Sequence, residues 1–140
     1  KKVEKRQVKS KYIPEVKVNR LNNNDFNKIL KAGCEEATYE DIIFDKYRNV
    51  YYRFACPQTE VDSKDSYLEI TRYGKKLFTI VILDKDLNII GEKLFPEFTY
   101  VPTAHLIRKD GLYISCSHFK NPNYSDDVLC FQKIKLTSNL

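Results

Sequence analysis

Apolar and polar residues alternate along most of the chain after residue 39, which is the pattern of strands in an antiparallel sheet. The alternating runs are separated by short turns that contain Asp, Asn or Gly, residues that tolerate positive φ or bond their own backbone. The runs that we expect to form strands are YEDIIFD, NVYYRFAC, KKLFTIVILD, NIIGEKLF, TAHLIR, GLYISCSH and DVLCFQKIKL. This part of the chain is therefore predicted to be a series of β-hairpins.

The first 38 residues do not follow this alternation. In NNNDFNKILKAG, Asp25 is placed to cap the first turn of a helix and Gly33 to end it. The apolar face of that helix would consist of Phe26, Ile29 and Leu30. We therefore divide the chain into 1–38, an extended basic lead-in with one short helix that belongs to a preceding blade or a linker, and 39–140, which holds antiparallel β blades.

Two segments of the β part repeat at an offset of 39 residues, because Asp45-Lys46 recurs as Asp84-Lys85 and Asn49 recurs as Asn88. Meander strands that repeat about every 40 residues are typical of β-propellers, whose blades stack face to face. The run FTIVIL is apolar on both faces and needs neighbours on both. We expect a mainly β fold of antiparallel meander sheets, forming a partial β-propeller of about two blades, since a closed ring needs roughly 160 residues or more. The repeat could also be out of phase with the blades. The first copy would then join the inner pair of strands of a blade and the second copy the outer pair.

The charge distribution of the chain indicates a possible anionic binding partner. The chain has 140 residues, of which 42% are hydrophobic and 13% aromatic, enough for one packed domain. Residues 1–20 carry eight Lys or Arg against two Glu, a net charge of +6, whereas the remaining 120 residues carry sixteen against seventeen, so the chain's net charge of +5 is concentrated in its first segment. Such a segment can bind nucleic acid or an anionic membrane surface. Its apolar residues nevertheless alternate with the charges, which favours a solvated edge strand or a frayed lead-in; they are Val3, Tyr12, Ile13, Val16 and Val18.

The four cysteines are Cys34, Cys56, Cys116 and Cys130. They form no C-x-x-C pair, and no His stands at metal-ligand spacing from them. Cys116 and Cys130 fall in apolar strand-like runs, where a free thiol acts as a small buried hydrophobe. Free thiols are the favoured interpretation, and one or more disulfides are the alternative.

The residues with catalytic potential have simpler structural roles. Acids in the predicted turns, which are Asp45, Asp84, Asp86 and Asp110, are interpreted as caps of backbone amides. His105 and His118 stand in strand-like runs and are interpreted as structural or surface residues. The tyrosines and arginines of YRNVYYRF could stack on single-stranded nucleic acid or sugars, but strand alternation favours cross-strand packing. No glycine-rich phosphate loop is present, so we predict no catalytic residue, no cofactor and no metal.

Several of these segments resemble the C-terminal part of a bacterial family of unknown function, whose members are predicted cell-envelope lipoproteins with a TolB-like, six-bladed propeller. The resemblance covers about residues 39–136 and is strongest in DKYRNVYYR, ILDKDLNIIGE and DGLYIS with its Asn-rich loop. It implies that Lys1 is an internal residue, that further blades precede it, and that a lipid-anchored Cys outside this chain holds the protein at the envelope. The family has no established catalytic residues to carry over.

The polar loop HFKNPNYSDD is the predicted binding region, because loops on a rigid sheet commonly carry function. Its candidate residues are His118, Asn121, Asn123 and Tyr124. The leading hypothesis is a non-enzymatic binding or scaffold module for a peptide, a glycan or another envelope protein. The alternatives are a hydrolase or lyase with a site at the propeller axis, and nucleic-acid binding through residues 1–20.

Overall fold

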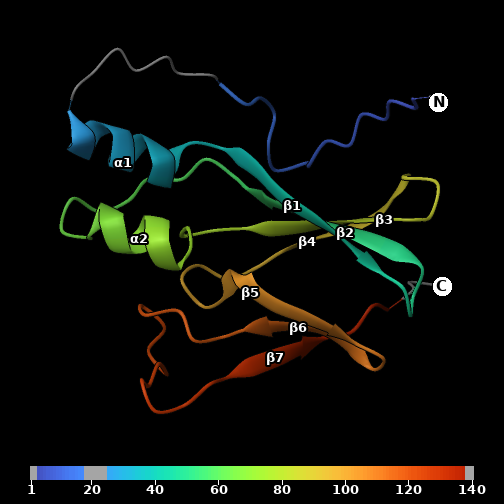
Figure 1. The fold of residues 1–140 in the computed structure, drawn as a ribbon. Coiled ribbons are helices and arrows are strands. Elements are labelled where there is room, and N and C mark those ends of the chain that lie inside the picture. Colours follow the sequence, from blue (N-terminus) through green and yellow to red (C-terminus); the bar gives the residue numbers. More distant parts are fainter. Residues whose placement is uncertain (1–2, 18–24, 138–140) are drawn as a thin grey trace.

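The computed structural model describes residues 3–17 and 25–137, which form two antiparallel sheets and two short helices (Figure 1). The first sheet has the order β1-β2-β3-β4 and the second has the order β5-β6-β7. The elements are α1 (Phe26–Glu35), β1 (Thr38–Asp45), β2 (Val50–Cys56), α2 (Tyr67–Tyr73), β3 (Thr79–Leu83), β4 (Ile89–Leu94), β5 (Val101–Arg108), β6 (Gly111–Ser115) and β7 (Phe131–Ile134). The predicted mainly β, antiparallel fold is confirmed, and each strand predicted after residue 39 lies at its expected place in the chain.

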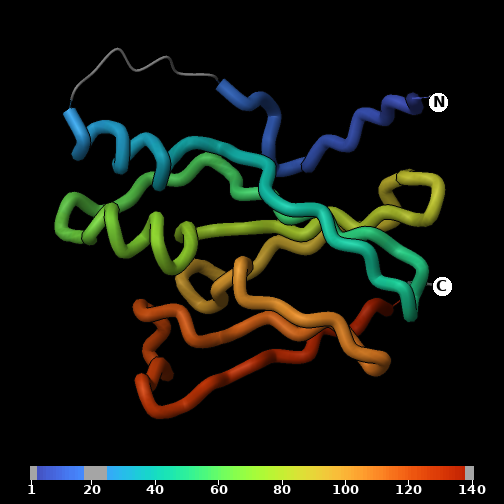
Figure 2. Tube along the Cα trace, in the orientation of Figure 1, coloured from blue at the N-terminus to red at the C-terminus, as the bar shows by residue number. Residues whose placement is uncertain are grey.

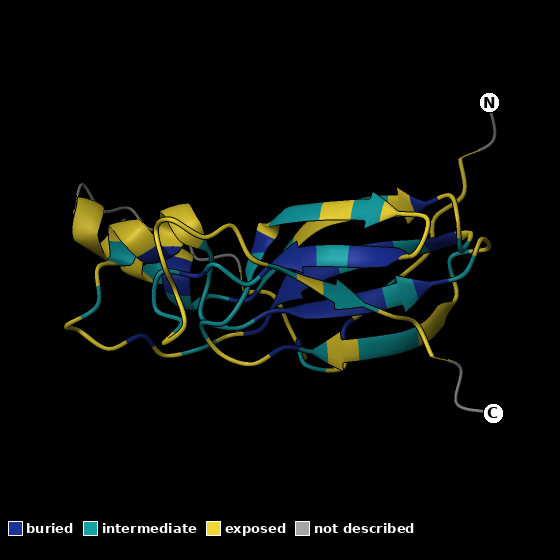
Figure 3. Cartoon of the chain, turned by 90° about the horizontal axis from the view of Figure 1, so that it is seen from below, coloured by how far each residue is buried: buried dark blue, intermediate teal, exposed yellow. Residues whose placement is uncertain are grey.

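The two sheets pack face to face around one hydrophobic core. Alternate residues of β2 and β3, among them Tyr52, Phe54 and Ile80, meet Leu112 and Ile114 of β6 in this core. The middle strands are therefore the most buried, while the edge strands β1, β4, β5 and β7 are largely half-buried or exposed (Figure 3).

The first sheet is also covered on its other face, as the run FTIVIL predicted. Val81 and Leu83 point to that face and are both 0% exposed. Residues 3–17 cross it as an irregular segment (Figure 2). Ser10 donates to the carboxylate of Glu92 over 2.5 Å, and Ile13 is buried against Ala55. The interpretation of this segment as an edge strand was wrong, because it lies across the sheet instead of pairing with it; Val18 falls outside the described residues.

Helix α1 begins as predicted, since the side chain of Asp25 accepts hydrogen bonds from the amides of Asn27 and Lys28. It ends later than predicted, because it continues past Gly33 to Glu35. Its expected apolar face is not the buried one: Phe26 is 64% exposed, and Cys34 packs against Ile70 of α2 instead.

Helix α2 was missed, because we read the whole chain after residue 39 as strands. Ser66 caps its first turn by accepting from the amide of Glu69, a pair that matches the S-x-x-E capping box. Gly74 ends it with φ of 128°, a value that favours glycine. Neither helix in the described ranges is long and apolar enough to cross a membrane.

The 39-residue repeat corresponds to two hairpins of one sheet. The first copy forms the β1–β2 turn and the second forms the β3–β4 turn. Asp45 and Asp84 accept from turn amides in both, as predicted. Both copies therefore lie in a single sheet, and the repeat does not mark a boundary between the two sheets.

Candidate functional site

A cleft of about 240 Å³ opens between the two sheets, where their edge strands β1 and β5 meet the end of α2. From β1 it is lined by Glu40 and Asp41, and from β5 by Pro102, Thr103 and His105. We call this cavity the inter-sheet cleft. Its lining residues come from five elements of both sheets and both helices, α1, β1, β2, α2 and β5, so its shape depends on how these elements pack.

Both edge strands lose their regular pairing where they line the cleft. In β1, Tyr39 pairs with Ala55 and Ile42 pairs with Arg53, which leaves Glu40 and Asp41 opposite a single residue of β2. In β5, the pairing breaks between Val101 and His105. Irregularities of this kind turn side chains away from simple alternation and are frequent beside binding sites.

Pro102 gives a chemical reason for the break in β5. A proline has no amide N–H and cannot donate to a strand ladder. Its ring also lies 3.3 Å from the position that a Cβ on Gly74 would take, so a larger residue at position 74 would crowd the contact between the end of α2 and β5. The rear of the cleft is thus formed by backbone and a rigid ring.

The floor of the inter-sheet cleft contains two stacked rings. The imidazole of His105 lies on the ring of buried Phe54, with centroids 5.0 Å apart and planes inclined by 22°. His105 Nδ1 lies 2.8 Å from the carbonyl oxygen of Pro102. Since a carbonyl can only accept, Nδ1 carries the proton and Nε2 is left as an acceptor in the neutral ring.

Cys56 is the thiol that lines this cleft. Burial raises the pKa of Cys56 to about 11, so the reactive thiolate is scarce near neutral pH. A cysteine nucleophile works through its thiolate and needs the opposite shift. The cleft is therefore poorly suited to covalent catalysis through sulfur. Within the described ranges, no cluster of three or more His, Cys, Asp or Glu is placed to hold a metal ion.

The four residues predicted from sequence lie in the loop between β6 and β7 and do not reach the inter-sheet cleft. His118 is 0% exposed, with Nε2 3.0 Å from the Gly74 carbonyl and Nδ1 accepting from the Lys120 amide. It also stacks on Phe119 at 4.8 Å. His118 therefore attaches the loop to the end of α2.

His118 should make stability depend on pH. Burial, chiefly, lowers the pKa of His118 in the folded state below the value of about 6.5 expected in the unfolded chain. The unfolded chain therefore binds the proton more readily, so this contribution is complete above pH about 6.5 and is lost as pH falls through the lower folded pKa. We expect His118→Gln, measured by urea unfolding at pH 7.5 and 5.0, to lose less stability on acidification than the unmodified chain. An equal loss of stability on acidification in His118→Gln and in the unmodified chain would contradict the assignment.

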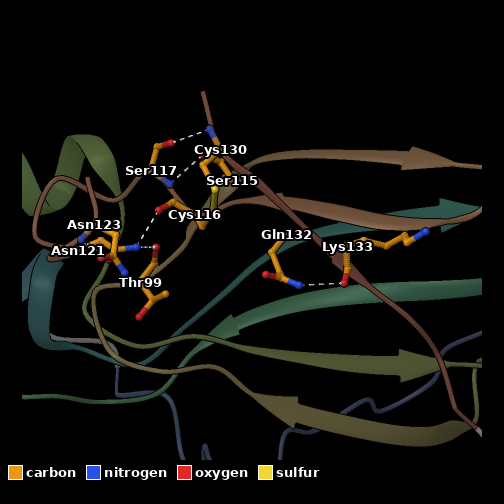
Figure 4. The surroundings of a disulfide bond; sticks show 9 residues. All are labelled: Thr99, Ser115, Cys116, Ser117, Asn121, Asn123, Cys130, Gln132 and Lys133. Atoms are coloured by element: carbon orange, nitrogen blue, oxygen red, sulfur yellow. Dashed lines mark hydrogen bonds between the residues drawn. A yellow bond between two sulfur atoms is a disulfide. The ribbon is translucent and has the colours of Figure 1, made fainter. Parts of the chain in front are cut away.

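Asn121 also holds the loop in place, as Figure 4 shows. Its side-chain amide donates to the carbonyls of Cys116 and Thr99 over 2.8 and 3.3 Å, and its side-chain oxygen accepts from the Asn123 amide. Asn121, Asn123 and Tyr124 line a second cavity of about 240 Å³ beside this loop. Asn123 and Tyr124 are exposed, so of the four predicted residues these two are accessible to a partner.

A disulfide closes the same loop (Figure 4). Cys116 and Cys130 are bonded, with their Cα atoms 5.4 Å apart, whereas Cys34 and Cys56 are free and buried. The favoured interpretation of four free thiols was wrong for the first pair. Both residues do stand beside strands, but β6 ends at Ser115 and β7 begins at Phe131, so the sulfurs lie at strand ends where they can meet.

Comparison with known proteins gives a family and one solved relative. A model described as a domain of unknown function, DUF4221, matches residues 1–94. A crystal structure of a DUF4221 family member from Bacteroides vulgatus aligns with a TM-score of 0.65 and 36% sequence identity, covering 75% of this chain and 29% of that one. No curated protein matches. The aligned part is thus less than a third of the solved relative.

Proposed function

This chain belongs to the DUF4221 family, a domain of unknown function, so the family does not supply a role. From the inter-sheet cleft we propose that the chain is a non-enzymatic binding module of a cell-envelope β-propeller. The observation that carries this proposal is the inter-sheet cleft, in which two irregular edge strands expose polar side chains above the stacked rings of Phe54 and His105. A concave site with an apolar floor and a few polar groups is the usual form of a small-ligand site.

The residues that line the cleft favour a binding function over a hydrolase or lyase activity. Acyl or phosphoryl transfer through an enzyme nucleophile needs a group that is activated by a base or by a lowered pKa. Cys56, the thiol that lines the cleft, has a raised pKa and is therefore not an activated nucleophile. The lining therefore supplies contacts and orientation, and we assign it no catalytic step.

A propeller arrangement is supported by the order of the strands. Each sheet is a meander that runs outward from β1 or from β5, and both of these first strands line the cleft. Propellers place their blades around a central channel, so we propose that β1 and β5 are the innermost strands of two neighbouring blades. The solved relative is more than three times as long as the part matched, which leaves room for further blades.

The proposed envelope location is supported by the disulfide, because disulfides persist in oxidising compartments such as the periplasm. The resemblance to envelope lipoproteins points to the same place. There the partner would be a peptide, a glycan or another envelope protein, and Asn123 and Tyr124 would offer a second contact surface at the same end of the molecule.

Blocking the cleft tests this function. Thr103 is exposed on the cleft rim, so Thr103→Trp should fill the cavity without disturbing the core. With a panel of amino acids, short peptides and oligosaccharides, we expect ligands that shift the NMR signals of His105 to bind at least about tenfold more weakly to this variant. Asn123→Trp in the loop is the matched control and should bind normally. Binding lost only in Asn123→Trp would move the function to the loop, and turnover of a bound ligand would favour the hydrolase or lyase alternative.

A further inference from the structure

The inter-sheet cleft is lined by two groups of each charge. Glu40 and Asp41 come from the irregular part of β1, Arg72 comes from the end of α2, and Lys75 follows the Gly74 cap of that helix. Across residues 3–17 and 25–137, none of these four groups belongs to an ion pair. Opposite charges that share one small cavity without pairing can each take a separate group of a ligand.

The two basic groups keep donors for such a ligand. Lys75 Nζ donates to the Glu36 carbonyl over 2.9 Å and to Thr38 Oγ1 over 3.1 Å. These bonds fix the ammonium group, which has three donors, and leave one of them. The guanidinium of Arg72 lies over the ring of Tyr73, 5.4 Å from its centroid, and makes no hydrogen bond in the described part of the chain.

The acidic groups are similarly available. One oxygen of Glu40 accepts from Thr38 Oγ1 over 2.6 Å, which positions that carboxylate and leaves its second oxygen for another donor. Asp41 has no hydrogen bond or ion pair among the described residues and is exposed. An ammonium group is the natural partner for two neighbouring carboxylates, because charge-assisted hydrogen bonds are stronger than neutral ones.

The volume of the cleft and its equal number of positive and negative side chains restrict the class of ligand further. A volume of 240 Å³ corresponds to about eight water molecules at liquid density, which suits a compact molecule. A simple anion would be attracted by Arg72 and Lys75 and repelled by the two carboxylates. A simple cation would be attracted by the carboxylates and repelled by the two basic groups. A neutral sugar would leave all four charges without a charged partner. A molecule with separated positive and negative groups satisfies both sides.

We propose that the inter-sheet cleft binds a compact zwitterion, namely an α-amino acid or a dipeptide with an apolar side chain. Its ammonium group contacts Glu40 and Asp41, its carboxylate contacts Arg72 and Lys75, and its side chain lies on Phe54 and Pro102. This assignment rests on the binding function proposed above and names the class of ligand for that same site.

L-Leucine and its blocked forms test the assignment by calorimetry and NMR. N-Acetyl-L-leucine lacks the positive charge, L-leucinamide lacks the negative one, and N-acetyl-L-leucinamide lacks both. We expect L-leucine to shift the signals of His105 and to bind at least about tenfold more tightly than each blocked form. Weaker binding of all three blocked forms supports a zwitterion site.

Two variants show which side of the cleft holds which group. Asp41→Asn should weaken L-leucine and L-leucinamide by about tenfold and leave N-acetyl-L-leucine unchanged, while Arg72→Gln should weaken L-leucine and N-acetyl-L-leucine and leave L-leucinamide unchanged. Lys109→Gln, in the exposed β5–β6 turn, is the control and should change none of them.

The failures are distinguishable. If N-acetyl-L-leucinamide or a neutral sugar binds in the cleft as tightly as L-leucine, the zwitterion assignment is overturned and the binding function stands. If no member of the wider panel shifts the NMR signals of His105, or if every ligand binds Thr103→Trp as tightly as the unmodified chain, then both the binding function of the cleft and the zwitterion assignment fail.

Discussion

Replacing Asp45 by alanine is expected to destabilise the domain by about 3 kcal/mol, because it removes the acceptor of a buried charged network. Asp45 is 0% exposed and accepts from the Tyr52 hydroxyl over 2.9 Å, from the side chain of Arg48 and from two turn amides. Burial by itself would raise the pKa of Asp45, but the hydrogen bonds from Arg48 and Tyr52 outweigh it and hold the pKa below its ordinary value. The carboxylate is therefore charged at neutral pH and fully paired.

The network also joins the two sheets. Arg48, held by Asp45, donates to the carbonyls of Arg108 and Lys109 in the β5–β6 turn over 2.9 and 3.1 Å. Burial, together with the neighbouring carboxylate, raises the pKa of Tyr52 to about 12, so its hydroxyl stays protonated and keeps donating to Asp45. Loss of Asp45 would leave Arg48 and Tyr52 without their shared partner at the contact between the sheets.

Asp84→Ala is the matched control, since Asp84 is the repeat copy of Asp45. It accepts from the amides of Asp86 and Asn88 in a largely exposed turn, and within residues 3–17 and 25–137 none of the hydrogen bonds of its side chain reaches the second sheet. Urea unfolding should show a loss of stability for Asp84→Ala far smaller than that for Asp45→Ala. Comparable losses would mean that turn capping, and not the joining of the sheets, accounts for the effect of Asp45.

The same pair shows what the sequence could predict. Turn chemistry is local, so the capping role of both aspartates follows from Asp, Asn and their spacing. The joining of the two sheets through Asp45 and Arg48 depends on contacts of Arg48 with residues 60 and 61 positions away, which no local pattern records. Helix α2 is different: Ser66 and Glu69 supplied a usable capping signal, and we missed it because strand alternation dominated the neighbouring segments.

The inter-sheet cleft was predictable only in part. His105 was interpreted as a structural or surface residue, but Pro102 is a signal that the strand around it is irregular. Glu40 and Asp41 follow each other in β1, so alternation would place them on opposite faces, and only the irregular pairing brings both to the cleft. Arg72 belongs to the helix that was missed. The site thus depends on departures from the regular pattern on which the predictions were based.

Removing the disulfide between Cys116 and Cys130 should also lower the free energy of unfolding substantially. Cys116 and Cys130 are separated by 14 residues, and closing a loop of that size stabilises a folded domain by about 3 kcal/mol, chiefly by restricting the unfolded chain. We expect the double variant Cys116→Ser, Cys130→Ser to unfold at a correspondingly lower urea concentration. Hydrogen exchange should first increase at the Lys120 and Asn123 amides, because the bonds that hold them, to His118 and Asn121, lie inside the closed loop.

Reduction provides the control for this variant. Treating the unmodified protein with a reductant should lower its urea midpoint to that of the double variant, whereas the same reductant should leave the double variant unchanged, because the remaining Cys34 and Cys56 are free and buried. A midpoint that is the same with and without the disulfide would contradict a stabilising role. Equal exchange at the Lys120 and Asn123 amides in both forms would show that His118 and Asn121 hold the loop without the covalent bond, and that the second cavity does not depend on the oxidation state of these cysteines.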